Sequence, residues 1–237
     1  MEKKMIRELK RRVCEANRAL EERGLVVLTW GNISGIDRAS GLVVIKPSGV
    51  AYRCLAPDDM VVVGLDGRTI EGRLRPSSDL PAHLELYRCF PETGGITHTH
   101  SPNATAFAQA CRPIPCMGTT HADYFRGPVP VTRPLSGPAI EAGYELNTGR
   151  AIVERFAGLD PMSVPAVLVA NHGPFTWGRT PEEALENCVA LEAVAGIALA
   201  TAAIEPGAGD IPSNLMEKHF LRKHGRGAYY GQNQQPT

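Results

Sequence analysis

The sequence predicts an α/β protein in which helices cover a sheet on both sides. Three observations support this prediction. The chain has 237 residues, enough for one domain with a substantial core. Apolar runs with helical spacing and with strand spacing alternate without a strict strand–helix–strand repeat, and loops rich in Gly and Pro separate them. We expect one domain over residues 1–232 and a disordered polar tail over residues 233–237.

The first third of the chain is expected to form one helix and several short strands. Apolar residues recur at helical spacing over residues 6–20, and Gly24 suits the position just beyond a helix end. Short β-type runs follow, and turn signals lie between and after them. These runs are residues 26–28, 42–45 and 60–63.

Later elements are predicted from helix-start signals and from one buried-strand run. A helix is expected to begin near Ser78-Asp79, with a proline in its first turn, and another at Ser101-Pro102. Residues 166–170 are continuously apolar, which is typical of a buried strand. Thr180 opens a capping box with proline at the first helical position, so we expect a long alanine-rich helix over residues 181–203.

Histidines recur where predicted strands end. Ile96, His98 and His100 are two residues apart, so a strand would point both imidazoles to one face. A third histidine, His172, follows the buried run at residues 166–170. The alternative is a surface strand that happens to carry two histidines, but the third one favours a site for a zinc-type divalent ion. Such an ion would need two further N or O ligands beside the first pair.

Two loops are suited to an anion. Residues 46–49 (Lys-Pro-Ser-Gly) leave a strand and offer a cation, a hydroxyl and a backbone amide. Residues 75–79 enter a helix, whose free N–H groups and positive dipole end attract phosphate. Gly31-Asn32 could supply a third contact. Taken singly, each loop is better explained as a simple turn or helix cap. Neither resembles a P-loop or a dinucleotide-binding glycine motif, so no nucleotide cofactor is expected.

Composition and charge exclude several partner classes. The formal net charge is zero, so we expect neither nucleic acid nor an anionic membrane as a partner. We find no apolar run near the length of a membrane span and no apolar signal core at the N-terminus. The six cysteines are scattered and contain no CxxC motif, which indicates reduced, small apolar side chains in a cytoplasmic protein.

Seven sequence blocks, in register from about residue 5 to residue 232, resemble the L-ribulose-5-phosphate 4-epimerases of the class II aldolase/epimerase family. The resemblance implies a three-layer α/β/α fold with a central, mostly antiparallel sheet flanked by helices. It also implies a four-fold homotetramer with active sites at subunit interfaces. The blocks are residues 29–34, 45–50, 76–79, 98–101, 118–125, 171–175 and 218–225 with 228–232.

The resemblance also implies a metal site. It assigns one Zn²⁺ per subunit, with Mn²⁺ or Co²⁺ as possible substitutes, to Asp79, His98, His100 and His172. Three imidazoles and one carboxylate are a sensible ligand set for such ions. In related fuculose- and rhamnulose-phosphate aldolases the position of Asp79 is typically glutamate, so the aspartate favours an epimerase. The alternative for Asp79, a carboxylate that interacts with a helix dipole, is compatible with metal binding.

The implied reaction converts L-ribulose 5-phosphate to D-xylulose 5-phosphate by inversion at C4, through retro-aldol cleavage and recombination. The resemblance assigns acid/base catalysis to Asp123 and Tyr230 of a neighbouring subunit, and His219 is a further contact. Without it, Asp123 could be a loop cap and Tyr230 a tail aromatic. The implied substrate and phosphate contacts are Gly31, Asn32, Lys46, Ser48, Gly49, Ser77 and Ser78.

Two other functions remain compatible with the sequence. One is a class II sugar-phosphate aldolase of the fuculose- or rhamnulose-phosphate type, which releases its aldehyde. The other is a non-catalytic association domain like the adducin head. The full set of candidate ligands and acid/base residues argues against the adducin-like function. Carbohydrate metabolism through L-arabinose breakdown is the expected pathway, while ascorbate- or xylulose-linked paralogues have very similar sequences.

Overall fold

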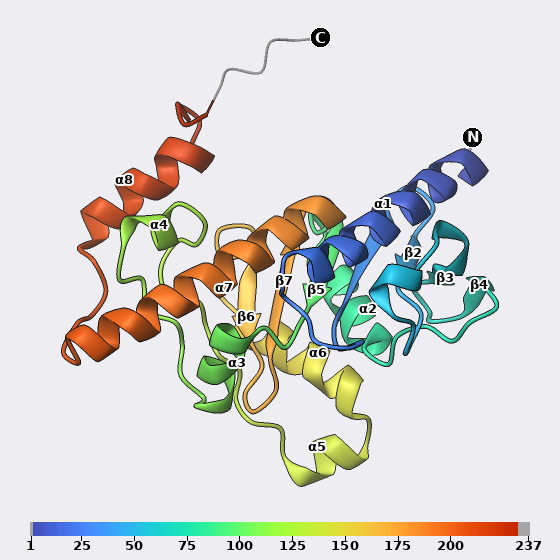
Figure 1. The fold of residues 1–237 in the computed structure, drawn as a ribbon, viewed down its shortest axis with the longest axis horizontal. Coiled ribbons are helices and arrows are strands. Elements are labelled where there is room, and N and C mark those ends of the chain that lie inside the picture. Colours follow the sequence, from blue (N-terminus) through green and yellow to red (C-terminus); the bar gives the residue numbers. More distant parts are fainter. Residues whose placement is uncertain (1, 232–237) are drawn as a thin grey trace.

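One seven-stranded sheet organises the protein, whose structure is a computed structural model that describes residues 2–231 (Figure 1). The strand order is β4-β3-β2-β1-β5-β7-β6, and every pair of neighbours is antiparallel. The tail predicted to be disordered, residues 233–237, lies outside the described residues. The strands are β1 (Asn32–Asp37), β2 (Leu42–Ile45), β3 (Val61–Gly64), β4 (Thr69–Glu71), β5 (Gly95–His98), β6 (Ala166–Leu168) and β7 (Pro174–Gly178).

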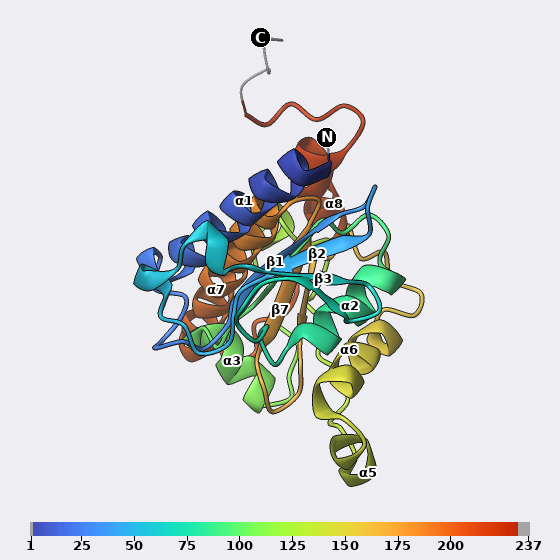
Figure 2. The ribbon, with the colours of Figure 1, turned by 90° about the vertical axis from the view of Figure 1, so that its right-hand side faces the viewer.

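Helices cover the two faces of the sheet, which confirms the predicted α/β/α layers. Figure 2 shows α1 and α7 on one face and α2 and α6 on the other. In Figure 1, α8 and α4 lie together at the end of the molecule away from β4. The helices are α1 (Glu2–Glu22), α2 (Leu80–Cys89), α3 (Pro102–Gln109), α4 (Thr119–Ala122), α5 (Gly137–Glu141), α6 (Tyr144–Arg155), α7 (Pro181–Ile204) and α8 (Ser213–His224).

The alternation of side chains along the strands divides the core between the two faces. In β2, Val43 and Ile45 belong to the larger buried cluster, whereas Val44 belongs to the cluster under α1. All three side chains are fully buried, because the sheet is covered on both faces. The apolar run at residues 42–45 therefore has no polar face, and its prediction as a strand was correct.

The predicted strand at residues 26–28 is wrong. These residues form a loop in which Leu28 has a positive φ of 56° and is 71% exposed. The strand is the next segment, β1, whose sequence Asn-Ile-Ser-Gly-Ile-Asp has a weak apolar pattern. A Cβ on Gly35 would lie 2.8 Å from Pro181 and 2.9 Å from Leu9. Close packing of α1 and α7 on the sheet thus requires glycine where strand propensity is low.

The helix α7 corrects the prediction that no apolar segment approaches the length of a membrane span. By length and composition alone, its 24 residues could cross a bilayer, with a mean hydropathy of 1.8 in the most apolar window. The helix packs on β5 and β7, and Leu191 and Ala195 are fully buried in the core. Core helices of soluble proteins meet the same criterion, so this segment is weak evidence for a membrane span. The predicted N-cap is confirmed, since Thr180 Oγ1 accepts a hydrogen bond from the Glu183 amide.

The cysteines are all free, as the sequence predicted. Three of them, Cys14, Cys116 and Cys188, are buried and act as small apolar side chains. Cys54 and Cys89 are exposed, so the prediction of an apolar packing role fails for these two.

Candidate functional site

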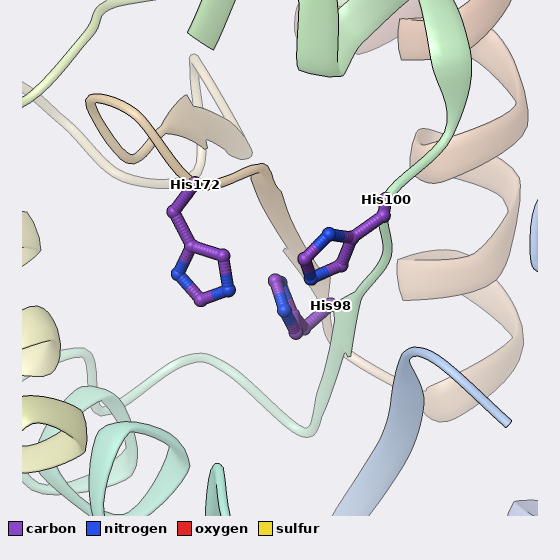
Figure 3. Close-up of side chains that lie close together, drawn as sticks. All are labelled: His98, His100 and His172. Atoms are coloured by element: carbon purple, nitrogen blue, oxygen red, sulfur yellow. The ribbon is translucent and has the colours of Figure 1, made fainter. Parts of the chain in front are cut away.

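Three histidines from two separate parts of the chain face one another (Figure 3). His98 is the last residue of β5, His100 follows two residues later, and His172 lies in the loop between β6 and β7. Their ring centroids are 4.7–5.0 Å apart, and one ring nitrogen of each lies within 4.8 Å of the other two. Antiparallel pairing of β5 with β7 brings the strand end and the loop together. The spacing suits a single divalent ion bound by all three imidazoles.

Neighbouring groups set the orientation of two of these rings. The Nδ1 atom of His98 lies 2.9 Å from the carbonyl oxygen of Pro174, and the imidazole stacks on the Phe175 ring at 4.3 Å. Only a protonated Nδ1 can donate to that carbonyl, which leaves Nε2 of His98 free as a ligand. The hydroxyl of Tyr144 lies 3.1 Å from Nδ1 of His172. Both rings are therefore held through the nitrogen that the metal would not use.

Burial favours the neutral form of the His100 and His172 imidazoles. Burial, together with His98 and His100, lowers the pKa of His172 to about 3. Burial also lowers the pKa of His100. A neutral imidazole has a free lone pair at pH 7, which is the form that binds a metal ion.

Asp79 lies in the same pocket but outside the cluster of converging imidazoles. It occupies the N-cap position of α2, yet its side chain makes no capping hydrogen bond. Its Oδ2 instead accepts a hydrogen bond of 2.7 Å from the Asn32 amide, and Ser77 Oγ lies 3.4 Å away. Burial alone would raise the pKa of Asp79, but His98, His83 and the Asn32 amide outweigh it and lower the pKa. The carboxylate is therefore ionised and faces the pocket.

Three loops line this pocket of about 590 Å³ beside the histidines. The first loop ends at Gly31, the second is residues 46–49, and the third is residues 75–79. Backbone hydrogen bonds join the second loop to the third, from Ser48 N to Arg75 O (2.9 Å) and from Ser77 N to Lys46 O (3.0 Å). The Asn32 amide at the start of β1 reaches Ser77 Oγ at 3.0 Å and so links the end of the first loop to the third. The predicted substrate contacts around the pocket are Gly31 on the first loop and Asn32 at the start of β1, Lys46, Ser48 and Gly49 on the second loop, and Ser77 and Ser78 on the third.

Lys46 is the cation of the pocket. It is 2% exposed, and its Nζ lies 3.3 Å from the Pro47 carbonyl and 4.8 Å from the centre of the Tyr52 ring. Burial lowers its pKa to about 8. Since neither contact carries a negative charge, an anionic ligand would be a favourable partner for the ammonium group.

Asp123 and Tyr230 lie away from this pocket, at the end of the molecule formed by α4 and α8. The Asp123 carboxylate accepts hydrogen bonds from Arg222 at 2.6 and 3.0 Å and lies 3.1 Å from Nδ1 of His219. Burial would raise its pKa, but Arg222 and His219 lower it. Tyr230 is 59% exposed, and the Arg222 guanidinium lies 4.9 Å from the centre of its ring. Within one chain, the predicted acid/base residues thus gather with each other and not with the histidines.

The structure adds pocket residues that the sequence analysis did not select. Trp30 lines the pocket and lies against His100, with ring centroids 6.3 Å apart. Tyr144 and Glu145 enter from the start of α6. Helical spacing of apolar residues over 144–155 could have predicted α6, but only the fold shows that its first turn faces His172.

Comparison with known proteins places this geometry in a family. The model of the class II aldolase and adducin N-terminal domain matches residues 11–199. The chain belongs to the class II aldolase and adducin N-terminal domain family. The family match covers all seven strands and the helices α2 to α6 in full, together with most of α1 and of α7.

Two curated relatives of this chain are both named L-ribulose-5-phosphate 4-epimerase UlaF. They come from Salmonella paratyphi A (strain ATCC 9150 / SARB42) and Salmonella typhi. Each is 53% identical to this chain over 227 residues, which are 96% of this chain and 100% of the relative. The resemblance seen in the sequence is thereby confirmed along almost the whole chain.

Solved structures of class II aldolases have the same fold. An L-fuculose 1-phosphate aldolase superposes with a TM-score of 0.76 at 26% identity, over 90% of this chain and 94% of the other. The L-fuculose-1-phosphate aldolase of Thermus thermophilus gives a TM-score of 0.64 at 27% identity, over 86% and 98% of the two chains. These matches confirm the class II aldolase fold predicted from the resemblance.

Proposed function

We propose that this protein is an L-ribulose-5-phosphate 4-epimerase, which inverts C4 of L-ribulose 5-phosphate to give D-xylulose 5-phosphate. The observation that carries the proposal is one pocket that joins three converging imidazoles to loops suited to a phosphate. This pocket belongs to a chain that is 53% identical to relatives named for that activity. The expected setting is carbohydrate metabolism in the cytoplasm, with L-arabinose breakdown as the expected pathway.

The chemistry requires cleavage of a carbon–carbon bond. A carbon that carries the 4-hydroxyl is two bonds from the ketone, so its hydrogen is not acidic enough for direct removal. Retro-aldol cleavage between C3 and C4 avoids this problem, because rotation of the resulting aldehyde before recombination inverts C4. A divalent ion, for which we propose zinc, supplies Lewis-acid stabilisation of the negative charge at the ketone end.

The donor set in the pocket fits such an ion. His98, His100 and His172 would hold it through neutral imidazole nitrogens, and the ionised Asp79 would be the fourth ligand. The hydrogen bond from Asn32 would keep the Asp79 carboxylate oriented toward the pocket. The short aspartate side chain restricts how far the carboxylate can move, which favours retention of both fragments over their release.

The loops would hold the phosphate and so keep the cleaved aldehyde in place. Ser48, Gly49 and Ser78 are exposed to the pocket, while Ser77 and Lys46 lie deeper. Hydroxyls, backbone amides and one ammonium group match the oxygens of a phosphate dianion. We therefore assign the phosphate to this end of the pocket and the ketone to the end with the histidines.

Acid/base catalysis would come from a neighbouring subunit of a homotetramer. Two groups are needed, one for each face of the aldehyde, and we propose Asp123 and Tyr230, with His219 beside them. All three lie at the end of the chain formed by α4 and α8, and the proposed assembly would bring that end to the pocket of a second copy. The separation of the two sets within one chain supports this arrangement.

Two alternative functions are weighed against the site. The solved structures of fuculose-1-phosphate aldolases share the fold, so release of the aldehyde is the main alternative. The adducin-like association function is disfavoured, because an association domain has no need for converging imidazoles beside a buried lysine.

Product analysis tests the proposed function. Metal-loaded protein should convert L-ribulose 5-phosphate to D-xylulose 5-phosphate, with only trace amounts of free dihydroxyacetone and glycolaldehyde phosphate. Chromatographic separation of the pentulose phosphates, together with an enzymatic assay of the fragments, distinguishes the reactions. Stoichiometric release of both fragments would identify an aldolase, and no turnover of any sugar phosphate would favour the association domain.

Removal of the phosphate contacts should weaken substrate binding. In a Ser48→Ala, Ser77→Ala double variant we expect the KM for L-ribulose 5-phosphate to rise, at a cost of about 1–3 kcal/mol for each lost hydrogen bond to the charged ligand. Inorganic phosphate should compete with substrate in the unmodified protein. Ser40→Ala is a control, because its hydroxyl bonds Asp37 away from the pocket. An unchanged KM in the double variant would move the phosphate site elsewhere.

Loss of the Tyr144 hydroxyl should weaken metal binding. In Tyr144→Phe the His172 ring loses the partner of its Nδ1 atom, and we expect the metal dissociation constant to rise about tenfold. Competition with a chromophoric chelator measures that constant directly. Tyr124→Phe is a matched control, since that hydroxyl bonds Glu186 outside the pocket. Equal affinities in both variants would show that Tyr144 does not orient His172.

A further inference from the structure

Tyr52 connects two of the three loops around the pocket without lining the pocket itself. It is fully buried in the short 3₁₀ turn Tyr52–Cys54, three residues after Gly49. Its hydroxyl lies 2.8 Å from the carbonyl oxygens of both Trp30 and Gly31. The hydroxyl has one proton to donate, so the two carbonyls share it. The loop that contains Trp30 is thereby fixed to the segment that follows the Lys46 loop.

The ring of the same tyrosine supports the cation of the pocket. Lys46 Nζ lies 4.8 Å from the ring centre, within the range of a cation–π contact. The ammonium is buried, and its other contact, a hydrogen bond to the Pro47 carbonyl, is long at 3.3 Å. A desolvated ammonium depends strongly on such contacts for its position. The ring is therefore one of the two groups that hold the ammonium in position when no anion is bound.

Gly31, which accepts a hydrogen bond from the Tyr52 hydroxyl, also packs against the strand end that contains His98. Gly31 has a φ of +93°, and a Cβ there would lie 2.7 Å from the carbonyl oxygen of His98. The backbone of Gly31 is therefore packed directly against the end of β5. The hydrogen bond from the Tyr52 hydroxyl to the Gly31 carbonyl therefore restrains the loop between the proposed phosphate end and the histidine end of the pocket.

We propose that Tyr52 is a positioning residue for phosphate binding. Its ring holds the Lys46 ammonium, and its hydroxyl holds the backbone of Trp30 and Gly31. The inference rests on the proposed phosphate site of the epimerase. It predicts that Tyr52 acts on binding of the phosphate group, because the ring and the hydroxyl contact the loops and neither contacts the imidazoles. Metal binding and the bond-breaking step should depend on it far less.

Two substitutions separate the two contacts. Tyr52→Phe keeps the ring and removes the hydroxyl, whereas Tyr52→Leu removes both. We expect the dissociation constant of inorganic phosphate, measured by calorimetry on metal-loaded protein, to rise about fivefold in Tyr52→Phe and further in Tyr52→Leu. The KM for L-ribulose 5-phosphate should rise in parallel, while kcat and metal content stay close to those of the unmodified protein.

A second buried tyrosine provides the matched control. Tyr87 is also fully buried on α2, and its hydroxyl lies 2.8 Å from Ser34 Oγ on β1, outside the three loops. Tyr87→Phe should lower the melting temperature without any change in phosphate affinity. If Tyr52→Phe behaves like Tyr87→Phe, with lower stability and unchanged phosphate affinity, Tyr52 is only a core residue and the inference is overturned. Since Tyr52→Phe preserves the buried ring, the test does not depend on whether Tyr52→Leu folds.

The calorimetric measurement also separates this inference from the proposed function. Inorganic phosphate binds without a sugar, so its affinity does not depend on which sugar phosphate is the substrate. If the unmodified protein binds phosphate but does not epimerise L-ribulose 5-phosphate, the proposed function fails, while weaker phosphate binding in Tyr52→Phe still supports the inference. If the unmodified protein does not bind phosphate, the inference is overturned.

Discussion

Replacement of His98 and His100 by asparagine is expected to remove both bound metal and turnover while the fold remains. The three imidazoles converge within 4.8 Å, so the loss of two leaves one histidine and one carboxylate for the ion. We expect about one divalent ion per chain in the unmodified protein and none in the double variant, by elemental analysis of the purified proteins. Activity on L-ribulose 5-phosphate should fall below detection in the same preparation.

The control for this variant is a buried histidine outside the cluster. His121 Nε2 lies 2.8 Å from the Gly127 carbonyl oxygen and does not line the pocket, so His121→Asn should retain its metal. Circular dichroism establishes that the double variant is folded. A full metal complement in the folded double variant would refute the metal site.

The second large effect concerns assembly, because the residues proposed for acid/base catalysis lie apart from the histidines of the same chain. His98→Asn and Tyr230→Phe should each be nearly inactive alone, since each removes one half of a site that two subunits complete. Mixed tetramers contain some interfaces in which an intact metal half meets an intact Tyr230. In a ring with equal random mixing, roughly one quarter of the sites have this arrangement. Activity should return to about that fraction of normal.

The mixing experiment requires that subunits be combined during folding and that the composition of the tetramers be verified by native mass spectrometry. Mixtures of unmodified protein with either variant serve as controls for subunit exchange. If Tyr230 served the metal of its own chain, every site would have one defect and mixing would restore nothing. Verified mixed tetramers without activity above that of the two parents would contradict a site built from two subunits.

Local sequence signals were sufficient for much of the fold. Helix-start signals predicted α2, α3 and α7 within two residues of their observed starts. Helical spacing predicted α1, although its start at Glu2 precedes the apolar pattern. Strand β1 was missed because its position at the centre of the sheet, and not its own pattern, determines its structure. The run at residues 26–28, in which Val27 and Leu28 are exposed, was mistaken for a strand because three apolar residues favour β structure wherever they lie.

The site was predictable only in part, and for a physical reason. Spacing of two indicated that His98 and His100 share one direction, and the structure brings His172 to them through the pairing of β5 with β7. Tyr52 and Tyr144 act through contacts between residues far apart in the chain, so no local pattern could reveal them. The roles assigned to Asp123 and Tyr230 came from family resemblance and stay predictions.

Turnover in D₂O tests the central claim, C4 epimerisation through carbon–carbon bond cleavage, most directly. If C3–C4 breaks and reforms, the hydrogen on C4 never leaves its carbon. We therefore predict D-xylulose 5-phosphate with no solvent deuterium at C4, as read by NMR, and with no accumulation of free fragments. Deuterium at C4 of the product would show that C4 is inverted by proton removal and would contradict the account.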